Sequence, residues 1–174
     1  MEIVLQDQEE EYFVESEEER ERLVSQALFD MSQETLDHES AMLLRATLGN
    51  PPPIPEIQKL VGRCAPPYHK GLTESDVNDH LDRLLIQKSF AMHNINPMLR
   101  PSENVEDGID VTVYDHRGRK YAMQYKLWCR KYYVLTKKWR AYREANKLQR
   151  GVQVTVWAFR RAIYPDDLCF AISF

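Results

Sequence analysis

Two kinds of apolar periodicity divide the chain. In the first fifty residues, apolar side chains recur at helical spacing and predict two helices, the second over about residues 33–48. From His69 onward, apolar and polar residues alternate, as they do in half-buried strands. The alternating segments 109–114 and 120–126 flank a turn over residues 115–118, so together they predict a β-hairpin.

Further apolar segments extend the strand pattern, and they lie at residues 83–86, 132–135, 152–157 and 168–172. After the second of them, Thr136 is expected to cap a short helix that carries Trp139 and Tyr142 and ends near Asn146. Short strands with one inserted helix, and without strand–helix–strand alternation, are typical of a barrel or a sandwich. The aromatic side chains expected in its core are Trp139, Trp157, Phe159 and Phe170.

A proline-rich stretch separates the two patterns. Pro51-Pro-Pro53 prevents the second helix from continuing and forms a stiff linker. A third, short helix is expected to begin near Pro55 and to end at Gly62. We therefore expect an acidic, partly helical extension over residues 1–50, a proline-rich linker with a short helix over residues 51–68, and a β-rich domain over residues 69–174.

The net charge of -4 conceals a strong division of charge. Residues 1–50 carry fourteen acids and three bases, whereas residues 69–174 carry twelve acids and eighteen bases. Between Arg117 and Arg150, twelve bases accompany a single acid, Glu144. Such a concentration of positive charge in a β-rich domain favours a polyanionic partner, and nucleic acid is the partner that we expect.

Other features of the sequence narrow the class of protein. The three cysteines are widely spaced and match neither a disulfide framework nor a zinc pattern, which favours a reducing compartment. No signal-like segment opens the chain, and no apolar run approaches the roughly 20 residues that cross a bilayer. The histidines have no metal-ligand spacing, and no catalytic motif is present. We therefore expect a soluble intracellular protein with no membrane contact, no enzymatic activity, no metal and no cofactor.

From about residue 70 to residue 172, the chain carries an ordered set of short motifs. In chain order they are Lys70-Gly-Leu-Thr-Glu-Ser-Asp-Val77, Arg83-Leu-Leu-Ile86, Gly108-Ile-Asp-Val-Thr-Val-Tyr-Asp115, Arg119-Lys-Tyr121, Tyr133-Val-Leu135, Trp139, Asn146-Lys-Leu148, Gly151, Val156-Trp157 and Leu168-Cys-Phe-Ala171. No single motif is diagnostic. The ordered set, however, resembles the plant-specific B3 DNA-binding domain, and within that family the divergent, reproductive-meristem-like branch.

The resemblance implies both a fold and a function. The implied fold is mainly β: a seven-stranded open pseudobarrel with short helices, preceded in this chain by the helical extension. The implied function is that of a plant nuclear protein that regulates transcription and grips the major groove of double-stranded DNA with two loops. The acidic N-terminal helices could then dock other transcriptional regulators. The resemblance sets no oligomeric state.

On this chain, the two implied loops are a first arm, residues 72–83, and a second loop, residues 127–131. Arg130 and Lys131 are the leading candidates for phosphate or guanine contacts, because Arg presents a forked pair of donors and Lys a mobile charge. The other candidates are Lys126 and Trp128 at the second loop, and Ser75, Asn78 and Arg83 in the first arm.

The chain departs from the family's pattern in two places. Val152 stands where family members usually have an aspartate, and the first arm contains the carboxylates of Glu74, Asp76, Asp79 and Asp82. A carboxylate that faces phosphate opposes the counterion release that drives binding to DNA. An alternative hypothesis is therefore a degenerate B3-like barrel that acts as a protein-interaction module, with weak or no DNA binding. The basic stretch favours DNA binding, and the acidic arm favours the alternative.

Overall fold

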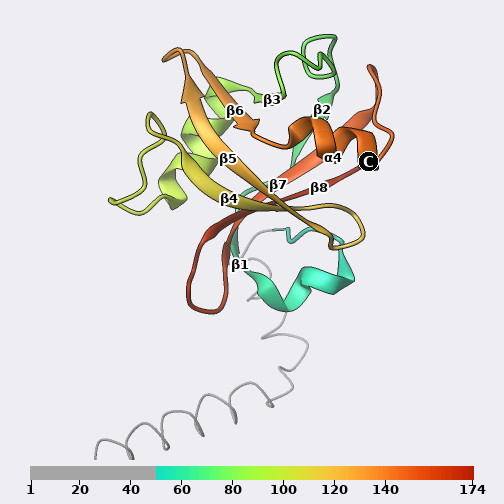
Figure 1. Cartoon of the computed structure of the whole chain (residues 1–174). Coiled ribbons are helices and arrows are strands. Elements are labelled where there is room, and N and C mark those ends of the chain that lie inside the picture. The colour runs from blue at the N-terminus through green and yellow to red at the C-terminus, as the bar shows by residue number, and fades with distance from the viewer. Residues whose placement is uncertain (1–49) are drawn as a thin grey trace, which may run out of the picture. The chain divides into compact units, whose positions relative to one another are not determined.

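The computed structural model describes residues 50–174, and eight strands of this part form one strongly bent sheet (Figure 1). The strands are β1 (Val61–Cys64), β2 (Tyr68–Gly71), β3 (Arg83–Ile86), β4 (Ile109–Tyr114), β5 (Lys120–Trp128), β6 (Tyr132–Thr136), β7 (Gln153–Arg161) and β8 (Leu168–Ser173). The helical elements are η1 (Pro55–Leu60), α3 (Lys88–Phe90), η2 (Ala91–Ile95), η3 (Asn96–Met98) and α4 (Trp139–Ala145). The two helices expected before residue 50 lie outside the described residues.

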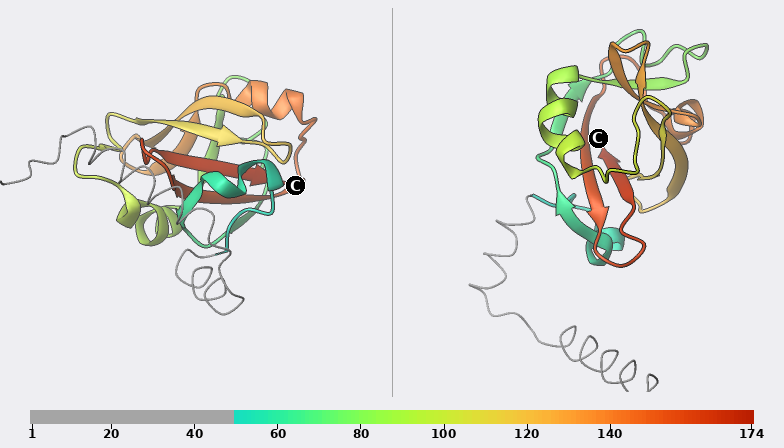
Figure 2. Two further views of the ribbon diagram at one scale, coloured as in Figure 1. Left: turned by 90° about the horizontal axis from the view of Figure 1, so that it is seen from below. Right: turned by 90° about the vertical axis from the view of Figure 1, so that its left-hand side faces the viewer.

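The sheet has the strand order β1-β7-β8-β4-β5-β6-β3, and β2 also pairs with β7. All of its pairs are antiparallel except β4 with β8. The views in Figure 2 show the sheet curling round on itself, so the fold is the mainly β, open pseudobarrel that the resemblance implies. It has eight strands rather than the expected seven in this part of the chain, because residues 61–64 form a strand instead of the end of a helix.

The inward faces of the strands form the main core. The predicted alternation in β4 is confirmed, since Ile109, Val111 and Val113 are buried in this core. Trp139 and Tyr142 enter it from α4, and their ring planes stack with centroids 5.5 Å apart. The predicted hairpin of β4 and β5 and the predicted strands β3, β6, β7 and β8 are all present.

A second core lies on the other face of β7 and β8. Trp157 and Phe159 of β7 point into it together with Cys169 and Ala171 of β8. Side chains from the segment before β2 cover them, namely Ile54, Ile57, Val61 and Cys64. The middle of β7 and most of β8 are therefore buried on both faces, which explains why their sequences are nearly continuous apolar runs.

The segment 51–68, which we expected to be a linker with a short helix, thus packs against the sheet. Its helix is the 3₁₀ helix η1, which ends at Leu60, and β1 then pairs with the C-terminal part of β7. An irregular helical stretch over residues 88–98, built from α3, η2 and η3, was not predicted from the sequence. No helix in the described part of the chain is both long enough and apolar enough to span a membrane.

The prediction that Thr136 caps the helix was wrong. Thr136 is the last residue of β6, and its hydroxyl donates to the carbonyl of Asp82, 3.0 Å away. The helix α4 instead begins after Lys138, whose backbone is left-handed at φ 60°. The carboxylate of Asp82 accepts the backbone N–H of Arg140 at 2.5 Å, so the first arm supplies the cap that α4 lacks in its own sequence.

Side chains close the opening of the barrel between β2 and β3. The Lys70 ammonium of β2 donates to the carbonyl of Leu85 in β3 at 2.6 Å and to the carboxylate of Asp76 at 2.9 Å. The same carboxylate accepts the Leu85 N–H at 3.1 Å and is 1% exposed. A lysine and a buried aspartate therefore replace the missing backbone ladder at this edge.

The environment of Asp76 favours the charged form of its carboxylate. Burial alone would raise its pKa, but donors from Thr73, Lys70 and Leu85 outweigh burial and hold the pKa below its usual range. The pKa of Lys70 is also lowered, because burial disfavours its charge more than Asp76 supports it. The pair is thus buried and charged, and removal of either partner leaves the other uncompensated.

The packing of residues 54–64 predicts that they contribute to stability. Replacement of buried Ile57 by alanine should lower the free energy of unfolding of the full chain by about 2–5 kcal/mol, as for other buried aliphatic side chains. The matched control is Gln58→Ala on the same helix, where the side chain is exposed and a change within about 0.5 kcal/mol is expected. Equal effects of the two substitutions in urea denaturation would show that η1 does not pack on the sheet.

The bridge at the barrel opening predicts a stability that depends on pH. Asp76→Asn should lower the free energy of unfolding at pH 7 by about 3–5 kcal/mol, because it leaves the Lys70 ammonium buried without a counter-charge. Since the folded-state pKa of Asp76 is depressed, its stabilisation is present above the unfolded-state value, about 3.9, and is lost as the pH falls through the folded-state pKa. The gap in the free energy of unfolding between the wild-type protein and the Asp76→Asn variant should therefore narrow as the pH falls.

Urea denaturation of both proteins at neutral and at acidic pH measures that gap. Glu74→Gln, which alters an exposed carboxylate of the same arm, serves as the control and should leave the stability nearly unchanged. A gap of constant size across the pH range would contradict the role assigned to Asp76.

Candidate nucleic-acid interface

The first arm and the second loop lie at the same end of the barrel, at the top of Figure 1. The first arm joins β2 to β3, and the second loop joins β5 to β6. A hollow of about 280 Å³ lies between them and is lined by Leu81, Gln124, Lys126, Trp128, Val134, Thr136 and Lys137. The two segments that sequence analysis singled out are therefore neighbours in space.

The second loop is tighter than the sequence suggests. Leu127 and Trp128 continue β5, so only residues 129–131 connect the two strands. Cys129 and Arg130 both adopt left-handed backbone conformations, with φ of 53° and 56°, and the Lys131 N–H closes the turn on the Trp128 carbonyl at 3.0 Å. This geometry places the exposed side chains of Arg130 and Lys131 at the tip of a hairpin.

Three bases around this tip lack an acidic neighbour. In the described part of the chain, Lys126, Arg130 and Lys131 have no ion pair within the 4.0 Å that defines one. The Lys131 ammonium lies 5.1 Å from the centroid of the Tyr132 ring. Trp128 is 38% exposed beside them. An exposed aromatic ring can stack on a nucleobase, and lysine or arginine side chains without a carboxylate partner can bind phosphates, so this group of side chains suits a nucleic acid.

Most arginines elsewhere in the basic stretch are engaged within the domain. Arg119 binds the fully buried carboxylate of Asp115 at 2.6 Å and the side chain of Asn146 at 3.0 Å. Burial alone would raise the pKa of Asp115, but the backbone N–H groups of Arg117 and Arg119 and the Arg119 guanidinium lower it below its usual value. Arg140, on α4, binds Glu144 at 2.8 Å. The positive charge available to a partner is therefore smaller than the composition suggests.

Every carboxylate of the first arm has a partner within the domain. Asp76 closes the barrel, and Asp82 caps α4, as described above. Asp79 forms an ion pair with Arg143 of α4, while Glu74 lies 3.4 Å from Arg150. The contacts of Asp79 and Asp82 hold the first arm against α4, and the ion pairs of Glu74, Asp76 and Asp79 offset part of its charge, so the arm is less repulsive to a polyanion than the sequence alone indicates.

The polar candidates of the first arm are partly engaged in local contacts. The Ser75 hydroxyl is 3.2 Å from the Thr73 hydroxyl, and the Asn78 carbonyl oxygen accepts the His80 N–H at 2.9 Å. The Asn78 side chain is exposed. Arg83, the last residue of the arm, points toward Trp128, and its guanidinium carbon lies 5.3 Å from the centroid of the indole. Arg83, at the end of the first arm, is thus in contact with Trp128 beside the second loop.

Two further residues face the same hollow. Gln124 shares the outward face of β5 with Lys126 and Trp128, a relation that strand alternation could have revealed. Lys137 precedes α4 with a left-handed φ of 60° and also lines the hollow. No local sequence signal marks that backbone conformation, because lysine rarely adopts it.

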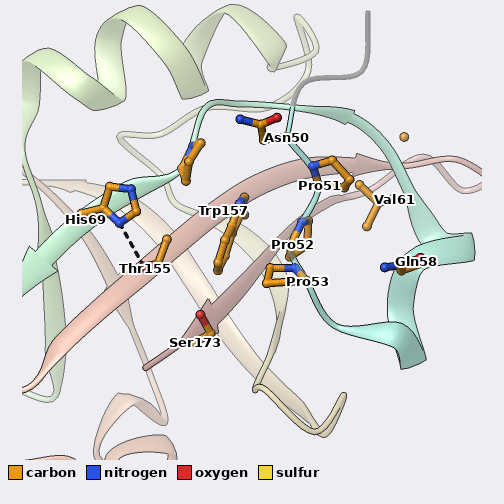
Figure 3. A pocket seen from close by; sticks show the side chains of 12 residues that line it. Asn50, Pro51, Pro52, Pro53, Gln58, Val61, His69, Thr155, Trp157 and Ser173 are labelled. Carbon is orange, nitrogen blue, oxygen red and sulfur yellow. Dashed lines mark hydrogen bonds between the residues drawn. The ribbon is translucent and has the colours of Figure 1, made fainter. Parts of the chain in front are cut away.

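A larger hollow of about 820 Å³ lies on the face of β7 that points away from the main core (Figure 3). Pro51, Pro52 and Pro53 border it on one side, and His69 and Trp157 on the other. The His69 ring binds the hydroxyl of Thr155 at 3.0 Å. None of the described residues that line this hollow is a lysine or an arginine, so its surface does not suit a polyanion.

Known proteins resemble this chain in sequence and in fold. Residues 67–174 match the family described as B3 domain-containing protein At2g31720-like. The putative B3 domain-containing protein At4g03170 of Arabidopsis thaliana is 37% identical over 121 residues, which cover 68% of this chain and 47% of that protein. The putative B3 domain-containing protein At4g03160 of the same plant is 30% identical over 103 residues, covering 59% and 53%.

A solved structure also resembles the chain. It is an Arabidopsis FUS3–DNA complex, and it aligns with 60% of this chain and 93% of its own at a TM-score of 0.44 and 24% sequence identity. The chain spans about half the length of the curated relatives it matches. Because the family match extends from residue 67 to residue 174 and so covers all but the first strand of the described barrel, the chain belongs to the At2g31720-like family of B3 domain-containing proteins.

Proposed function

We propose that the barrel binds double-stranded DNA through the surface formed by the first arm and the second loop. The protein would act in the nucleus as a transcriptional regulator, without a catalytic step or a cofactor. Membership of the B3 family supports this proposal, because the B3 domain is a DNA-binding domain. The β-rich domain that begins near residue 69, with η1 and β1 packed on it, would be the binding unit.

One observation carries the proposal: in the described part of the chain, basic side chains without an ion pair gather near carboxylates that already have partners within the domain. Lys126, Arg130 and Lys131 surround the exposed Trp128, and the nearby carboxylates of the first arm are engaged by α4 and by the barrel itself. A phosphate that approaches this end of the barrel therefore meets lysine and arginine with little competing negative charge. Each neutralised phosphate releases counterions, which drives binding.

The side chains suit different parts of a duplex. The Arg130 guanidinium presents a forked pair of donors, which fits either the acceptor edge of guanine or a phosphate. Lys131 and Lys126 offer mobile ammonium groups that fit phosphates better than base edges. Ser75 and Asn78, in the first arm, could donate or accept single hydrogen bonds at the opposite side of the same groove.

A protein-interaction module remains the second candidate function. The observation that favours it is the apolar tip between β7 and β8, where Ile163 and Tyr164 are 58% and 92% exposed. This tip lies at the other end of the barrel from the two loops (Figure 1). Docking of other regulators by the acidic residues 1–50 is a separate proposal, which their charge supports.

The proposed interface predicts the effect of removing its tip charges. Arg130→Ala combined with Lys131→Ala should weaken binding of the full chain to duplex DNA. Loss of phosphate contacts would reduce the slope of log affinity against log salt by roughly one unit per contact, whereas loss of a guanine contact would cost about 1–3 kcal/mol at one base position. Lys59→Ala with Arg63→Ala removes the same charge from exposed positions on η1 and β1 and should have a smaller effect.

Titration of fluorescent duplexes at several salt concentrations measures these effects, after selection of preferred sequences from a random library. Absence of any salt-sensitive binding by the wild-type chain near 50 mM salt, together with a library that enriches no motif, would rule out the DNA-binding proposal. Equal losses in the two double variants would instead point to a diffuse electrostatic attraction without a defined interface.

A further inference from the structure

Arg83 and Trp128 form a contact that links the two proposed DNA-binding loops. The guanidinium carbon of Arg83 lies 5.3 Å from the centroid of the Trp128 ring. Arg83 begins β3 and Trp128 ends β5, and β6 lies between these strands in the sheet. The arginine side chain therefore reaches across a whole strand to meet the indole.

Two of the Arg83 nitrogens are enclosed in this arrangement. Nε and Nη1 are buried and have no hydrogen-bond partner in the described part of the chain. Enclosed donors without partners are unfavourable, and contact of the cation with an aromatic face is the interaction that compensates for them here. Because these two donors are inaccessible, Arg83 cannot present its full fork to a base edge.

Trp128 lines the hollow between the two loops together with a buried apolar residue, Val134. Val134 of β6 is 1% exposed although it belongs to neither core cluster, so it faces outward and is covered. It lines the hollow between the loops together with Leu81 and Trp128. Trp128 therefore lies in a hollow of mixed apolar and polar side chains, and the Arg83 guanidinium contacts its ring.

We propose that Arg83 is a positioning residue, which holds Trp128 and thereby sets the placement of the second loop relative to the first arm. The inference rests on the proposed DNA binding and deepens it. Trp128 immediately precedes the tight turn that carries Arg130 and Lys131, and its carbonyl closes that turn. A shift of Trp128 moves the turn, and two loops that enter one groove tolerate only small errors in their relative placement.

A phosphate contact and a positioning role predict different responses to Arg83→Lys. Lysine keeps the charge but lacks the planar guanidinium that stacks on an aromatic ring. If Arg83 positions Trp128, then Arg83→Lys and Arg83→Ala in the full chain should each weaken DNA binding by about two- to fivefold. If Arg83 instead contacts phosphate, the lysine variant should retain most of the affinity, and the alanine variant should lose about one unit of salt slope.

A double-mutant cycle adds a second criterion. Arg83→Ala in a Trp128→Ala background should cause little further loss, because the arginine acts through the indole. Arg63→Ala, which removes an exposed base from β1, provides the control and should combine additively with Trp128→Ala. Additive effects of Arg83→Ala and Trp128→Ala would overturn the proposal.

A measurement without DNA separates failure of this inference from failure of the proposed function. Trp139 and Trp157 are buried, so collisional quenching by acrylamide reports mainly on Trp128. Quenching should increase in both Arg83→Lys and Arg83→Ala and remain unchanged in Arg63→Ala. Unchanged quenching in the two Arg83 variants would refute the contact. Increased quenching in a chain that binds no DNA would retain the contact and refute its role in binding.

Discussion

The buried contact between Lys70 and Asp76 holds the open barrel together. No backbone pairing joins β2 to β3 in the described part of the chain, and this ion pair with the Leu85 peptide bridges the opening. The backbone carbonyl of Asp76 also accepts the Trp139 indole N–H at 2.7 Å, which fixes α4 to the same point. The motif that begins at Lys70 therefore encodes barrel closure, helix docking and the start of the first arm together.

That constraint explains how an acidic arm can lie within a proposed polyanion-binding surface. Asp76 binds Lys70 within the barrel, while Asp79 and Asp82 bind α4. These contacts order the arm, and its carboxylates are not left without a partner. The arginines of α4 are occupied in turn. Charge counted along the sequence overstates both the acidity of the arm and the basicity of the helix, because the two cancel where they meet.

The predictability of the fold follows the strength of local signals. Alternation in β4 and β5 revealed the hairpin, since each strand has one buried face. The short helix η1 was predicted, but the strand β1 and the burial of this segment as a layer on the sheet were not, because a proline-rich segment resembles a linker, although the continuous apolar run of β8 required a layer on its second face. The cap of α4 comes from Asp82, far away in sequence, and no local pattern could predict it.

Of the candidate residues, the second-loop bases were recognisable by charge, whereas the contact of Arg83 with Trp128 depends on tertiary geometry.

Both proposed loops are held by contacts within the barrel that do not require a partner. The first arm is clamped by ion pairs to α4, and the second loop is a tight turn whose preceding indole rests against Arg83. Loops that are ordered before binding lose little conformational entropy when they bind. Lys126, Arg130 and Lys131, which have no ion pair in the described part of the chain, would contribute sequence-independent attraction to phosphate, whereas the shape of the ordered loops and individual base contacts would supply the preference for a particular site. On this physical argument, rigidity at the loop end would favour discrimination between DNA sequences over general adhesion to DNA.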